Sequence, residues 1–151
     1  MKRSSYVRLL AGAFLVVLGI IPAACNAGQD VAKNTIEVTF DGDGCKYQGS
    51  KEVSESDISV RVDNQSEGAL MLDVLRFQEG KTYEDLVAYF GSGAGPAELP
   101  SWSRSVASMP ASARESVSVG MALSAGNYAL VCSTELPTPQ VQPVAAFTVV
   151  P

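Results

Sequence analysis

Apolar and polar positions alternate along most of the chain after residue 34. In the segment TIEVTF, Ile36, Val38 and Phe40 alternate with polar neighbours. A period of two predicts a strand with one buried face. The same alternation recurs in three further segments, at residues 58–62, 117–123 and 128–132. The pattern therefore predicts a mainly β protein.

Two segments depart from this alternation. Residues 69–77 are apolar almost throughout, which is typical of a strand buried on both faces. Thr82 precedes a segment with helical spacing and Gly91 follows it, so a short helix is predicted between an N-cap and a terminating glycine. The residues expected on its buried face are Tyr83, Leu86, Val87 and Phe90.

Turn signals separate the predicted strands. Asp41-Gly42-Asp43-Gly44 and Ala125-Gly126-Asn127 are rich in the residues that turns require. Residues 102–108 predict a weak strand, and the chain closes with a strand at 147–149. About seven short strands, with no helix between successive ones, favour an antiparallel β-sandwich.

The last part of the chain resembles the end of a cupredoxin. Gly126 and Tyr128 precede Cys132, a proline-rich loop follows, and Phe147-x-Val149 closes the pattern. The stretch from Val62 to Leu72 also resembles the region where cupredoxins place their first histidine. The resemblance implies an all-β, cupredoxin-like Greek-key β-sandwich with one short helix, in a family whose members carry electrons at type 1 copper.

The N-terminus has the pattern of an export signal. Lys2, Arg3 and Arg8 precede an apolar run at residues 9–21. This run is too short to span a bilayer stably, but it has the length of a signal-peptide core.

The end of this segment resembles the lipobox of bacterial lipoproteins. Ala23 and Ala24 directly precede Cys25, and Pro22 stands where that motif usually has Leu. The resemblance implies a lipid on Cys25 that anchors the protein on the extracytoplasmic side of a membrane in the bacterial cell envelope. The alternative is ordinary cleavage after Ala24 or Ala27, which would leave a secreted protein. The predicted organisation is a signal peptide at 1–24, a polar tether at 25–34 and one cupredoxin-like domain at 35–151.

The charge of the chain bears on its partners. The formal net charge is -5. Loss of Lys2, Arg3 and Arg8 with the signal peptide takes -5 to -8, because residues 1–24 contain three cations and no anion. An acidic domain repels phosphate backbones, so nucleic acid is not an expected partner. The membrane contact is expected to come from the lipid anchor.

The copper ligands of the family are largely missing. A type 1 site needs two imidazoles and a thiolate, and the chain has no histidine. Only Cys132 survives, so no metal or other cofactor is predicted. An alternative is a Cu(I) site built from Cys132 with Met71, Met109 or Met121, although methionines also fill gaps in hydrophobic cores.

The absence of histidine also argues against an enzymatic function. Without histidine the commonest general base and metal ligand is missing, so no catalytic residue is assigned and the protein is not expected to be an enzyme. The Asp41–Gly44 segment is similar to the start of a calcium loop and Glu52 lies at its twelfth position. A plain turn is the simpler interpretation.

The chain has three cysteines, so if Cys25 carries the lipid, the other two are left as a possible disulfide pair. Cys45 and Cys132 each share a strand face with an apolar neighbour, and an exported chain meets an environment in which such a pair is oxidised. A Cys45–Cys132 disulfide is therefore predicted. The alternative is two buried free thiols that pack as small hydrophobic side chains.

These observations lead to two function classes. The first is a membrane-anchored binding or interaction module without type 1 copper, whose partner is another envelope protein or a small ligand. Its candidate ligand loop runs from residue 91 to Trp102, although Trp102 also suits a core position. The alternative class is an atypical sulfur-ligated copper-binding or electron-transfer protein.

Overall fold

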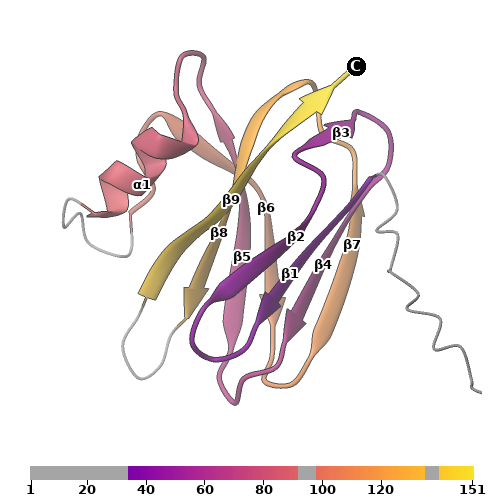
Figure 1. Cartoon of the computed structure of the whole chain (residues 1–151), viewed down its shortest axis with the longest axis vertical. Helices are drawn as coiled ribbons and strands as arrows, with labels where there is room; N and C mark the ends of the chain where they lie inside the picture. Colours follow the sequence, from indigo (N-terminus) through magenta and orange to yellow (C-terminus); the bar gives the residue numbers. More distant parts are fainter. Residues whose placement is uncertain (1–33, 92–97, 135–139) are drawn as a thin grey trace, which may run out of the picture.

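The computed structural model describes residues 34–91, 98–134 and 140–151. Within these ranges, nine strands form two facing sheets, and one short helix lies on the outer side of one of them (Figure 1). The strands are β1 (Thr35–Phe40), β2 (Cys45–Gly49), β3 (Glu52–Ser54), β4 (Ile58–Asn64), β5 (Leu70–Phe77), β6 (Ser103–Ala111), β7 (Ser116–Met121), β8 (Gly126–Thr134) and β9 (Gln140–Val150), and the helix is α1 (Tyr83–Gly91). The predicted all-β sandwich with one short helix is confirmed.

The predicted N-terminal segments lie outside the described residues, apart from Asn34. This applies to the signal peptide at 1–24, to most of the tether at 25–34, and to Cys25 itself. Within the described part of the chain, α1 is the one helix, and it is too short and too polar to cross a membrane.

The strand order shows how the chain moves between the sheets. One sheet has the order β2-β1-β4-β7 and the other has the order β3-β9-β8-β5-β6. The expectation of an antiparallel sandwich is wrong for two pairs, because β1 pairs with β4 and β3 with β9 in parallel. The chain reverses after β1 and again after β3, so β4 returns to the first sheet in the direction of β1.

The main core lies between the sheets and follows the predicted alternation. Ile36 and Val38 of β1 are fully buried and pack with alternate residues of the facing sheet. The expectation that β5 is buried on both faces is also confirmed. Leu72 belongs to the core between the sheets, whereas Leu75 and Phe77 face the opposite side and pack with the helix.

Helix α1 begins and packs largely as predicted. The amide of Asp85 donates to Thr82 Oγ1 at 3.3 Å, and the amide of Thr82 donates to Asp85 Oδ2 at 3.0 Å. These reciprocal bonds are a capping box. Leu86 is fully buried against the five-stranded sheet. Val87 was expected on the buried face, but it is 46% exposed because the helix covers the sheet with a narrower stripe.

Several strand boundaries differ from the sequence-based expectation. β3 was not predicted, because three residues are too few to show a period. β6 and β9 are longer than expected. The alternation at residues 117–123 predicts a strand with one buried face, yet Val119 on that face is 38% exposed. The reason is that β7 is an edge strand of the four-stranded sheet.

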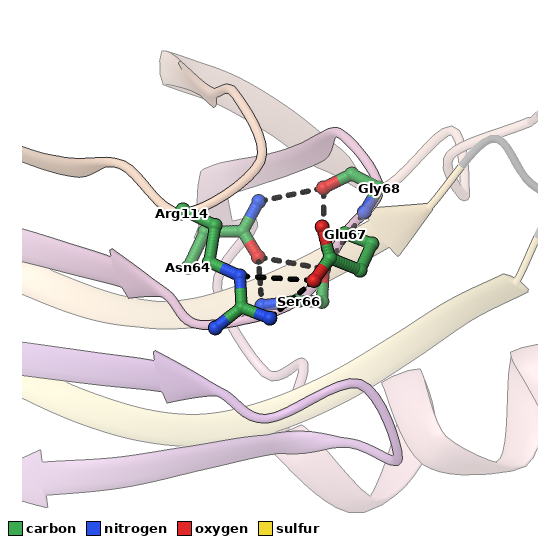
Figure 2. A network of polar contacts seen from close by, with 5 residues as sticks. All are labelled: Asn64, Ser66, Glu67, Gly68 and Arg114. Carbon is green, nitrogen blue, oxygen red and sulfur yellow. Dashed lines mark hydrogen bonds and ion pairs between the residues drawn. The ribbon is translucent and has the colours of Figure 1, made fainter.

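The turn between β6 and β7 contains an unusual backbone conformation. Arg114 has a φ of 59°, in the left-handed region that favours glycine. Its amide donates to the carbonyl of Ser66 at 3.1 Å, and its guanidinium forms an exposed ion pair with Glu67 (Figure 2). Tertiary contacts therefore hold a residue other than glycine in this conformation.

Replacing Arg114 should reveal that strain. Arg114→Gly and Arg114→Ala both remove the ion pair with Glu67, but only alanine keeps a Cβ in the left-handed region. The glycine variant should be the more stable of the two by about 1 kcal/mol in the free energy of unfolding. Urea denaturation of both variants measures the difference. An alanine variant as stable as the glycine variant would contradict the assigned backbone conformation.

Candidate functional site

The sulfur atoms of Cys45 and Cys132 are bonded to each other. The S–S distance is 2.05 Å and the Cα atoms lie 6.5 Å apart. Cys45 begins β2 in the first sheet and Cys132 lies in β8 of the second, and both are buried. The predicted disulfide is confirmed, and it joins the two sheets at one end of the sandwich.

A glutamine on β9 supports this end of the molecule. Gln142 is the strand neighbour of Cys132, and its Oε1 accepts a hydrogen bond from the amide of Cys45 at 3.2 Å. Gln142 thus links the backbone beside one bonded cysteine to the strand beside the other. No local pattern predicts this contact, because 97 residues separate its two partners.

Asn64 is the buried polar residue of this end. It is 1% exposed and lies beside Phe40, which in turn pairs with Cys45. Its Nδ2 donates to three backbone carbonyls, those of Gly68 at 2.8 Å, Ala111 at 3.1 Å and Ser112 at 2.9 Å.

The other atom of the Asn64 amide is equally engaged. Oδ1 accepts from the amide of Ser66 at 3.1 Å and from its hydroxyl at 2.8 Å (Figure 2). An amide whose oxygen and nitrogen are both hydrogen-bonded to the protein fixes the backbone and leaves little capacity for a ligand. Asn64 therefore closes this end of the sandwich.

The residues present do not fit a type 1 copper site. The chain contains no histidine, and the Cys132 sulfur is bonded to Cys45, so it cannot supply the thiolate. Among the described residues, no three Cys, Asp or Glu side chains are grouped as metal ligands would be.

The methionines considered for a sulfur-ligated site lie apart from Cys132. Met109 is separated from Cys132 by the β5 residue Leu72, so their strands are about 10 Å apart. Met71 precedes Leu72 and faces the opposite side of the sheet. Met121 lies at the other end of the first sheet, where it pairs with Ile58. The described sulfur atoms are thus not arranged around one ion.

The Asp41–Gly44 segment is a hydrogen-bonded turn. Asp41 Oδ1 accepts from the amides of Asp43 at 3.1 Å and Gly44 at 3.2 Å, while Oδ2 accepts from Lys46. The hydrogen bond from Lys46, followed by those from the two amides, lowers the pKa of Asp41 to about 2. Both carboxylate oxygens therefore already have partners within the turn, which supports the interpretation as a plain turn.

Trp102 lies in the smaller hydrophobic cluster, between α1 and the five-stranded sheet. Its ring meets Phe77 edge-on at 5.7 Å and Tyr89 at 6.4 Å, and Lys81 Nζ lies 5.3 Å from the ring centroid. The side chain is only half-buried. One part of the indole packs against these neighbours, and the rest is accessible to solvent. Residues 92–97 of the candidate ligand loop lie outside the described residues.

A shallow cavity opens near the disulfide. It has a volume of about 270 Å³ and is lined by Ala69, Leu70, Met71, Pro110, Ala111, Ser112 and Ser133. None of these side chains titrates, so the lining of this cavity is uncharged.

Comparison with known proteins gives fold likeness alone. No protein-family model matches the chain, and no curated protein matches it. A solved structure similar to it is the Na-dithionite-reduced auracyanin of the photosynthetic bacterium Roseiflexus castenholzii, with 21% identity and a TM-score of 0.45, covering 78% of this chain and 98% of that one. Another is auracyanin A, a "blue" copper protein of the green thermophilic photosynthetic bacterium Chloroflexus aurantiacus, with 21% identity and a TM-score of 0.43, covering 77% of this chain and 96% of that one.

Substitution of Asn64 should destabilise the fold. Asn64→Ala leaves three carbonyls without their donor and should lower the free energy of unfolding by about 2 kcal/mol or more. Asn64→Asp has the same shape but directs a charged acceptor at those carbonyls, so it should be at least as unstable. Ser66→Ala removes a hydroxyl that donates to Asn64 Oδ1 and accepts from the amide of Gly68, but it keeps the Asn64 amide, so it should cost less, about 1 kcal/mol. Chemical denaturation ranks the three variants, and an Asp variant as stable as the native protein would contradict this role.

Proposed function

We propose that the protein is a membrane-anchored, extracytoplasmic binding module with a cupredoxin-like fold that works without type 1 copper. The observation that carries the proposal is the bond between Cys45 and Cys132. A sulfur in a disulfide cannot also be a copper thiolate, and the chain offers no imidazole in its place.

The disulfide also supports an extracytoplasmic location. Disulfides form and persist in oxidising compartments and are rare in the cytosol. This agrees with the export signal predicted for residues 1–24. With Cys45 and Cys132 bonded, Cys25 is the cysteine left for lipid attachment, and the tether at 25–34 would keep the domain close to the membrane surface.

The proposal is for binding and not for catalysis. A sequence without histidine lacks the commonest general base. The partner in the proposal is a small ligand or another envelope protein, and nucleic acid is disfavoured by the acidic charge of the chain.

The state of the sulfur atoms distinguishes this proposal from copper electron transfer. The purified, denatured and unreduced mature protein should show no reactive thiol, and two should appear after reduction. The chain-entropy model predicts that a Cys45→Ser, Cys132→Ser double variant loses roughly 4 to 5 kcal/mol of stability. Addition of Cu(II) to the native protein should give no intense blue absorption. A blue band, or two reactive thiols before reduction, would contradict the proposal.

The lipid anchor is tested by Cys25→Ser. The native protein should partition with membranes, whereas the variant should be released or should accumulate unprocessed, since the anchor depends on this one side chain. A Cys45→Ser variant, which keeps Cys25, is the matched control and should stay with membranes. Normal processing and unchanged membrane fractionation of Cys25→Ser would exclude lipidation.

A further inference from the structure

The basic residues of the described chain divide into paired and unpaired groups. The ion pairs are Lys46 with Asp41, Arg61 with Glu37, Lys81 with Asp85, and Arg114 with Glu67. Within the described ranges Lys51, Arg76 and Arg104 form no ion pair. In a chain with 16 acidic and 11 basic residues, acidic partners are not scarce. A shortage of acidic residues therefore does not explain why these three basic side chains have no ion-pair partner.

Two of them are direct neighbours. Arg76 of β5 lies opposite Arg104 of β6 in the antiparallel register, so both side chains are on the same face of the sheet. Like charges at directly opposite positions destabilise a sheet. An anion bound close to both arginines would offset that repulsion.

The guanidinium of Arg76 is held in place by the protein. It donates to the carbonyl of Ala125 at 2.9 Å and lies 5.8 Å from the centroid of the Tyr128 ring. Gly126 leaves the space that it needs, since a Cβ there would meet the guanidinium nitrogens at 3.3 Å. The donors that do not reach Ala125 are left for a ligand.

Arg76 and Arg104 border a cavity of about 510 Å³. Its lining is Arg76, Phe77, Gln78, Ser101, Ser103 and Arg104. Guanidinium, amide and hydroxyl groups supply polar atoms, Phe77 also borders the cavity, and none of the described lining residues is acidic. The volume falls within the range of about 300 to 1,000 Å³ that is usual for small-molecule sites.

We propose that this cavity binds a small organic molecule through an oxyanion group, a carboxylate or a phosphate. Planar guanidinium groups bind such groups by paired, charge-assisted hydrogen bonds. The Gln78 amide and the Ser101 hydroxyl would donate to the remaining oxygen lone pairs, because the Ser103 hydroxyl already donates to the carbonyl of Pro100 at 3.0 Å. The body of the molecule would fill the rest of the cavity. This inference deepens the proposed binding function and rests on it only in treating the protein as a binding module.

The surroundings of the cavity favour a ligand larger than a bare ion. A second cavity of about 340 Å³ has Phe77 in its wall and is also lined by Lys51 and Lys81, together with Glu84. The third unpaired cation, Lys51, thus borders space that adjoins the same phenylalanine. An organic anion could extend in this direction.

Trp102 provides a direct measurement of binding. It is the single tryptophan of the chain, and its neighbours Ser101 and Ser103 both line the cavity. The full-length mature protein, in a non-ionic detergent, is titrated with inorganic phosphate, phenyl phosphate, acetate and benzoate at constant ionic strength set with chloride. The aromatic anions should give a saturable change in tryptophan fluorescence and bind more tightly than the corresponding small ions.

The two series of probes separate the sources of the oxyanion. Tighter binding of phenyl phosphate would indicate a phosphate ligand, and tighter binding of benzoate a carboxylate ligand. Either result supports an oxyanion site. Absence of a saturable response to all four probes would overturn the inference.

Variants test whether the response comes from this cavity. Arg104→Gln changes an exposed residue and should weaken binding of the better aromatic anion about tenfold or more, because charge-assisted hydrogen bonds are lost. Arg61→Gln removes the same charge from the other sheet, and at moderate salt its effect should stay within about twofold. Equal weakening by both variants would show a general charge effect and overturn the site.

A further substitution tests Arg76, the less exposed arginine of the pair. Arg76→Gln should also weaken binding, and its melting temperature verifies that it folds. If it does not fold, the comparison of Arg104→Gln with Arg61→Gln decides alone. The copper, thiol and membrane tests involve none of these residues, so a failure here would leave the proposed function standing.

Discussion

The bond between Cys45 and Cys132 is the constraint on which the interpretation of this molecule depends. It joins the two sheets at one end of the sandwich across 87 positions of sequence. Closing so long a loop restricts the unfolded chain far more than the folded one. The same bond removes the only sulfur that the cupredoxin resemblance would give to copper. Stability and the absence of a free thiolate thus follow from one covalent feature.

The surroundings of the disulfide agree with a structural role. The amide of Asn64 is hydrogen-bonded through both of its polar atoms, and Gln142 binds the backbone of Cys45. Bonds of this kind satisfy buried backbone groups where β strands end and turns begin. The cavity nearby is lined by side chains that do not titrate. The end of the sandwich that the resemblance associates with metal is therefore closed by the protein's own groups.

Much of the fold could be predicted from the sequence, because it depends on local patterns. The alternation at Ile36 and Val38, the apolar run of β5 and the cap at Thr82 each carry a signal within a few residues. β3 could not be predicted in this way, because it is short and its pairing with β9 joins residues almost a hundred positions apart. The parallel direction of β1 and β4 likewise depends on how the chain crosses between the sheets, which periodicity does not encode.

The candidate sites show the same division. The disulfide was predictable from the number of cysteines and the faces of their strands. The pair Arg76 and Arg104 was not, because neither residue belongs to a motif and only the register of β5 with β6 brings them together.

The charge of the molecule explains why that pair stands out. Basic residues elsewhere in the described chain mostly have acidic partners, whereas this pair is placed side by side at the far end of β5 from the disulfide. In an acidic protein the long-range field disfavours anions, so an anion would be retained only where local donors outweigh it. Two arginines at paired strand positions, lining a cavity that has no acidic lining residue, meet that condition. One end of the sandwich is closed by a disulfide and by a fully hydrogen-bonded Asn64, and the basic residues described there are paired with acidic ones. The other end presents arginines without an ion-pair partner, so binding is better sought there.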